Sequence, residues 1–94
     1  MIGNGGGTYR LMITCIDDML AAPNATMSPG TLNQQCTTAN GWMAGGTGNF
    51  LKEQVFSIIV DPSARGHVFH YIATLVGGNG DIVSFMESNR FILV

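Results

Sequence analysis

Apolar and polar residues alternate in the segment 8–16, near the start of the chain. The odd-numbered positions are Tyr9, Leu11, Ile13 and Cys15, and the even-numbered positions are Thr8, Arg10, Met12 and Thr14. A period of two is typical of a strand that buries one face. The sequence therefore predicts a half-buried strand over 8–16, which ends at Asp17 and Asp18.

A helix start is indicated by Ser28 and Pro29. A serine hydroxyl can accept hydrogen bonds from the free amides of a first helical turn, and proline is compatible with the first helical position. Leu32, Gln35 and Cys36 would then share one helical face, and Asn40-Gly41 is typical of a helix end. We therefore expect one short helix that packs across the strand 8–16, with Cys36 on its inward side.

The segment 50–60 fits two structures. Phe50, Leu51, Val55, Ile58 and Ile59 fit a helical stripe, with Asn49 as cap and Pro62 as stop. The run from Val55 to Val60 is instead rich in the β-branched and aromatic residues that favour strands. We prefer the strand and keep the helix as the alternative.

Two more strand-like runs, 67–76 and 82–86, flank the turn-forming residues 77–81, so a β-hairpin is expected there. Phe91–Val94 resumes strand character at the end of the chain. Together these segments predict a single α+β domain over 1–94, with a small antiparallel sheet of about four strands and one short helix on one of its faces. The glycine-rich stretches 1–7 and 41–49 are expected to be flexible.

Trp42 and Met43 stand out within the glycine-rich loop 41–49. Large apolar side chains on such a loop either enter the core or are offered to a partner. The sequence leaves both interpretations open.

Low charge excludes several classes of function. Charged residues make up 11% of the chain, the formal net charge is −2, and the mean hydropathy is +0.26. The basic residues Arg10, Lys52, Arg65 and Arg90 are scattered, so no basic surface predicts nucleic-acid binding. The apolar runs are far shorter than the roughly 20 residues that cross a bilayer, so no membrane span is expected.

The two cysteines, Cys15 and Cys36, are expected to lie in the core. They could form a disulfide bond, or they could be buried thiols. The first seven residues lack the charge and apolar run of an export signal. The low charge and the abundance of Gly, Thr and Asn slightly favour a secreted or virion-associated environment over the cytoplasm.

No set of residues predicts catalysis or metal binding. His67 and His70 would point to opposite faces of a strand, so they cannot share a metal ion. Asp17 and Asp18 are more typical of a strand end than of an acid and base pair. We expect no cofactor, no metal and no catalytic residue.

The run 67–76 is apolar on both faces, and a small domain with one helix can cover only one of them. The second face would carry Val68, His70, Ile72, Thr74 and Val76. The sequence therefore predicts a non-enzymatic binding or structural module that forms a homodimer through this face.

Two alternatives stay open. The first is a half-barrel that binds a small apolar ligand in a pocket, with weak hydrolase or isomerase activity through Asp17 or His70. The second is an exported or virion structural protein.

Overall fold

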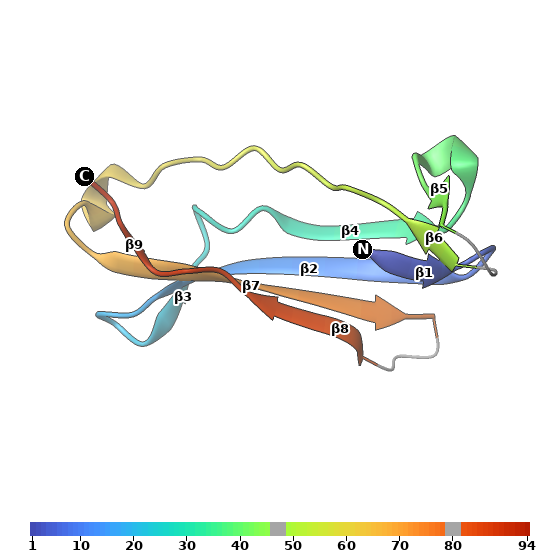
Figure 1. Ribbon diagram of the computed structural model, residues 1–94. Helices are drawn as coiled ribbons and strands as arrows, with labels where there is room; N and C mark the ends of the chain where they lie inside the picture. The colour runs from blue at the N-terminus through green and yellow to red at the C-terminus, as the bar shows by residue number, and fades with distance from the viewer. Residues whose placement is uncertain (46–48, 79–81) are drawn as a thin grey trace.

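The computed structural model describes residues 1–45, 49–78 and 82–94, and it shows a chain built almost entirely of strands (Figure 1). The strands are β1 (Ile2–Asn4), β2 (Thr8–Asp17), β3 (Ala22–Asn24), β4 (Gly30–Gln35), β5 (Met43–Ala44), β6 (Asn49–Leu51), β7 (Val68–Gly77), β8 (Ile82–Glu87) and β9 (Phe91–Ile92). Within the described residues, the only helices are the single 3₁₀ turns η1 (Thr38–Asn40) and η2 (Pro62–Ala64).

The centre of the fold is the antiparallel pair of the two ten-residue strands, β2 and β7. The other edge of β2 pairs with β4 and then with β3, and the other edge of β7 pairs with β8 and then with β9. The result is a six-stranded sheet that is four strands wide. A separate three-stranded sheet has the order β1-β6-β5.

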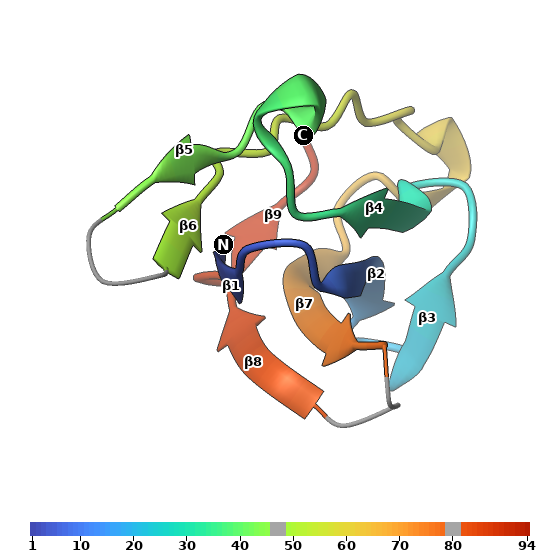
Figure 2. The ribbon, with the colours of Figure 1, turned by 90° about the vertical axis from the view of Figure 1, so that its right-hand side faces the viewer.

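One face of the large sheet is covered. Leu11 lies opposite Leu75 in the β2–β7 register, and both side chains belong to a buried cluster with Tyr9, Cys36 and Trp42. A second buried cluster, nearer the other end of the strands, contains Cys15, Met27, Ala64 and Phe69. The small sheet and the extended segment 52–61, which we call the strap, pass over this covered face (Figures 1 and 2).

The predicted helix after Pro29 is wrong, and with it the α+β fold class. The residues form strand β4, in which Leu32 lies opposite Leu11 of β2. Gly30 has φ +97°, a left-handed conformation that a helix does not use. The Ser28 hydroxyl also has another role, since it accepts from the Cys15 amide and donates to the Asn24 carbonyl. The face of the predicted helix contains few apolar residues, and pairing with β2 buries them as well as a helix would.

The strap is neither the paired strand that we preferred for this segment nor the helix that we kept as the alternative. Residues 53–60 run extended between β6 and η2 and form no backbone hydrogen bond with another described residue (Figure 1). Phe56 contacts the core, while Val55 and Ile59 are 79% and 71% exposed. The apolar and β-branched residues of this segment therefore accompany an extended backbone, although no strand among the described residues pairs with it.

The predicted hairpin of 67–76 and 82–86 is confirmed by the antiparallel pairing of β7 with β8. Its turn, 79–81, lies outside the described residues. The predicted first strand is confirmed as β2, and the apolar end of the chain contributes β9, which pairs with β7. The two glycine-rich segments that were expected to be flexible contain short strands. Residues 2–4 of the first form β1. In the second, β5 and β6 pair on either side of residues 46–48, which lie outside the described residues.

Candidate functional site

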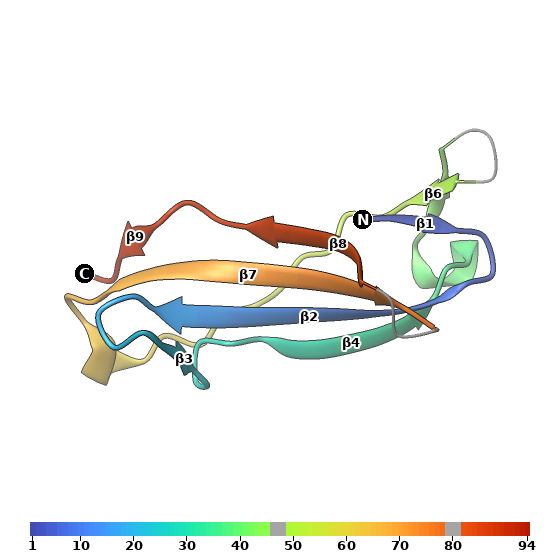
Figure 3. The ribbon, with the colours of Figure 1, turned by 90° about the horizontal axis from the view of Figure 1, so that it is seen from below.

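The second face of the large sheet lies on the side away from the small sheet and the strap (Figure 1). The five β7 residues that the sequence assigned to it, Val68, His70, Ile72, Thr74 and Val76, share this face because they alternate with the core residues Phe69 and Leu75. His70 and Val76 are buried there, with 7% and 6% of their surface exposed, and the other three are half-buried. Figure 3 shows this face toward the viewer, with the strap behind the sheet. We call it the uncovered face.

Neighbouring strands extend the apolar surface of the uncovered face. The register places Met12 opposite Thr74, Thr14 opposite Ile72, and Ile16 opposite His70. On the far side of β7, Phe85 of β8 lies opposite Thr74 and is 55% exposed. An antiparallel sheet that meets water normally carries polar side chains on its wet face. The centre of this face carries apolar side chains and threonines instead.

The charged groups of the uncovered face lie near its margins. His70 Nδ1 is 2.9 Å from an Asp18 carboxylate oxygen, and Arg90 Nε is 3.4 Å from the other oxygen. Arg10 lies opposite Val76 near the far end of β7, and Glu87 lies opposite Ile72 on the edge strand β8. Thr74 therefore has no charged cross-strand neighbour, whereas Ile72 has Glu87 beside it on β8.

A second aspartate–histidine pair lies on the covered face. His67 Nδ1 is 2.6 Å from Asp17 Oδ2, and Asp17 Oδ1 accepts hydrogen bonds from the amides of Met19 and Leu20. The hydrogen bond from His67, supported by the two amides, lowers the pKa of Asp17 even though burial acts in the opposite direction. Asp17 therefore stays ionised and closes the turn after β2.

The two pairs do not form one reactive site. Asp17 and Asp18 are consecutive strand-end residues, so their side chains point to opposite faces and each takes a different histidine. Neither imidazole is hydrogen-bonded to a hydroxyl or a thiol in the described part of the chain. Three metal-binding side chains do not converge anywhere among the described residues. The sequence did not predict this pairing, because it depends on the β2–β7 register.

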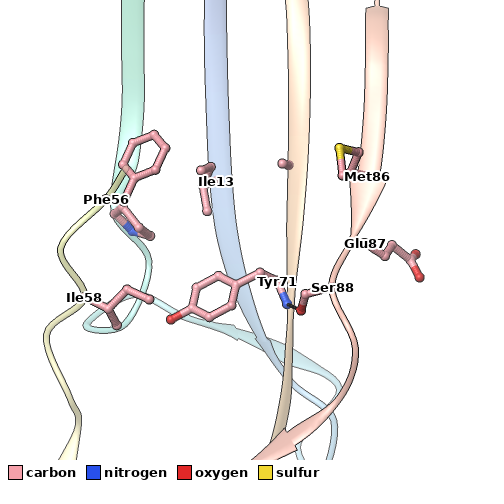
Figure 4. Close-up of a pocket in the computed structure, with 9 residues that line it drawn as sticks. Ile13, Phe56, Ile58, Tyr71, Met86, Glu87 and Ser88 are labelled. Atoms are coloured by element: carbon pink, nitrogen blue, oxygen red, sulfur yellow. Dashed lines mark hydrogen bonds between the residues drawn. The ribbon is translucent and has the colours of Figure 1, made fainter. Parts of the chain in front are cut away.

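An apolar groove runs between the covered face and the strap. It consists of two adjoining cavities of about 270 and 290 Å³, which share Ile13, Phe56, Ala73 and Met86 as lining residues. Figure 4 shows Tyr71 reaching across the first cavity between Ile58 and Ser88. Burial raises the pKa of Tyr71 to about 12, and its hydroxyl donates to the Met27 carbonyl at 3.0 Å.

The remaining candidate residues lie in different surroundings. Trp42 is buried against Tyr9, with 5.7 Å between ring centroids, whereas its neighbour Met43 is exposed. Cys15 and Cys36 are buried, as expected, but they belong to separate clusters and are free thiols. Burial raises the pKa of both thiols, which keeps them protonated and unreactive.

Comparisons with protein-family models, with curated proteins and with solved structures find no match to this chain. None of the helices in the described residues has the length and apolar character needed to span a membrane. The function must therefore be argued from the surfaces of this chain.

Proposed function

We propose that the protein is a structural or binding module that self-associates through the uncovered face, most simply as a two-fold dimer. The observation that carries the proposal is the row of half-buried apolar and threonine side chains at the centre of the sheet face that lies away from the small sheet and the strap. Burial of apolar area contributes roughly 25 cal/mol per Å², so a second copy on this face would stabilise both chains. A two-fold axis allows the same face to serve on both copies.

The charge pattern supports association of like faces. In the middle of the face, Ile72 and Thr74 meet the uncharged residues Thr14 and Met12 across β2. On the other side, Thr74 meets Phe85 and Ile72 meets Glu87 of the edge strand β8. Charged groups at the margin can stay hydrated while the centre is buried. This is the usual arrangement of an interface, which has an apolar core and a polar rim.

Sedimentation velocity of the wild type and Ile72→Lys tests the proposal. We expect Ile72→Lys to sediment as a smaller species than the wild type, because the substitution places a charge at the centre of the contact. Thr74→Lys repeats the test at a site without a large apolar side chain, so the result does not depend on one variant remaining folded.

Ile59→Lys is the matched control, since it makes the same substitution on the exposed strap, and it should leave the dimer intact. A monomeric wild type would refute the proposal. So would folded Ile72→Lys and Thr74→Lys variants that both sediment as the wild type does.

The groove beneath the strap favours a second candidate function, the binding of a small apolar ligand. Its two cavities are lined mainly by apolar side chains, and together they reach the size range of small-molecule sites. Dodecanol is a suitable test ligand. Calorimetry should detect its binding to the wild type and not to Ala73→Phe, whose ring would fill both cavities, and an absence of heat with the wild type would remove this candidate.

A further inference from the structure

The two outer edges of the large sheet differ in their protection against pairing with another strand. The edge formed by β3 and β4 carries Pro23 and the exposed polar residues Thr31, Asn33 and Gln35. Proline and polar side chains are common means of preventing edge-to-edge association. This edge is therefore protected.

The edge formed by β8 has no proline and no charge before Glu87, and its protection is limited to a register shift near Val83, where the pairing with β7 moves between Leu75 and Val76. Its residues from Val83 to Met86 include no charge and no proline, and the three apolar side chains among them are 51%, 55% and 67% exposed. The first charged residue of the described strand is Glu87, at its last position. Exposed apolar edges of this kind are templates for the addition of a strand.

The backbone of β8 has groups that point away from β7. The Ser88 amide donates to the Tyr71 carbonyl at 2.9 Å, so the amide of Ser88 points toward β7. Amide directions alternate along a strand, which places the N–H groups of Glu87 and Phe85 on the outer side. No other described strand pairs with β8 on that side.

We propose that β8 pairs antiparallel with β8 of a second copy of this chain, across a two-fold axis near Phe85. In this arrangement each Phe85 donates its outward N–H to the other, and the large sheet continues from one copy into the next. Each Glu87 lies opposite Val83 of the other copy, so the two carboxylates stay apart. A second copy fits because the same uncharged edge is present on both sides.

The edge contact uses the outward backbone groups of β8, whereas the face contact uses side chains of β2 and β7. Phe85 borders both surfaces, so both experiments below are made in the Ile72→Lys chain. Where both contacts form, each is two-fold, and their combination links dimers into an open assembly rather than a closed pair. Where the face contact is removed, the edge contact alone produces a dimer that cannot grow.

The first experiment measures disulfide cross-linking of Phe85→Cys under mild oxidation, with Ser63→Cys as an exposed control. The native thiols are buried, so the introduced thiol is the accessible one. Paired residues in an antiparallel ladder have Cα atoms about 5.5 Å apart, within the range of disulfides. We expect Phe85→Cys to cross-link about a hundredfold faster than Ser63→Cys, because pairing raises the thiol concentration from about ten micromolar to roughly millimolar. Equal rates would overturn the proposal.

The second experiment isolates the outward amide. Phe85→Pro removes the ring and the N–H, while the matched Phe85→Ala removes the ring and keeps the N–H. Both are made in the Ile72→Lys chain, in which only the edge contact remains, and are examined by sedimentation velocity. We expect a dimer for Phe85→Ala and a monomer for Phe85→Pro. A monomeric Ile72→Lys parent, or a Phe85→Pro chain that still dimerises, would refute edge pairing without bearing on the face contact.

Discussion

The two faces of the large sheet are made by alternate residues of the same two strands, yet only one face has a cover. Leu75 packs beneath the small sheet and the strap, whereas Ile72, three residues earlier on β7, lies on the face without a described cover. The chain has enough residues for one covering layer. The alternation of residues along a strand therefore identifies the two faces of the sheet, but it does not decide which face the rest of the chain buries.

The largest expected effect is the loss of a core side chain. Leu75→Ala should lower the free energy of unfolding by about 2–5 kcal/mol, because a buried leucine is replaced by a cavity. Ile72→Ala, measured in dilute solution where the chain is monomeric, should cost about 1 kcal/mol. Urea denaturation of both variants measures the difference. Equal losses would mean that the two faces do not differ in burial.

The next effect concerns the Asp17–His67 pair on the covered face. The pKa of Asp17 is lowered in the folded chain, so its ionised form stabilises the fold above about pH 4, and this contribution is lost as the pH falls further. Asp17→Asn should therefore melt at a lower temperature than the wild type at pH 7. The two melting temperatures should converge near pH 2. A constant difference across that range would show that the carboxylate charge is not responsible.

A smaller effect is expected at Ser28, whose hydroxyl joins the loop before β4 to the covered face of β2. Ser28→Ala leaves the Cys15 amide without its acceptor and should cost roughly 1–3 kcal/mol. Ser57→Ala, at an exposed serine of the strap, is the matched control. Thermal denaturation should separate the two variants, and equal melting temperatures would mean that this hydrogen bond does not stabilise the sheet.

The smallest effect is expected on the outer side of the strap. Val55→Thr changes a side chain that is 79% exposed, so the free energy of unfolding should change by no more than about 0.5 kcal/mol. Phe56→Thr, at the next position, removes a contact with the core and should cost clearly more. Denaturation curves of the pair test whether the strap covers the core with alternate side chains.

The strands could be predicted from the sequence because β2 and β7 alternate over ten residues and 77–81 are turn formers. The segment after Pro29 could not, because Ser28-Pro29 is typical of a helix start whereas the decisive feature is the partner strand β2. The strap could not be distinguished from a paired strand, since β-branched residues favour extended structure with or without a neighbour.

The alternation in β7 predicted which residues share the second face of the sheet. The groove and the two aspartate–histidine pairs were not predicted, because each joins residues that are distant in sequence, such as Asp17 and His67. A partial signal was present for Asp17, which shares the parity of Cys15 and therefore points to the same face. Nothing in the sequence alone identified its partner.

The most direct test of the uncovered face is methyl NMR with a soluble paramagnetic agent at low and high protein concentration. The account predicts that the Ile72 methyl signals are strongly broadened in dilute protein and become protected as the concentration rises, while those of Ile59 on the strap stay broadened throughout. Ile72 signals with the same broadening at every concentration, in a range where the protein sediments as an oligomer, would contradict the central claim that this face is the interface.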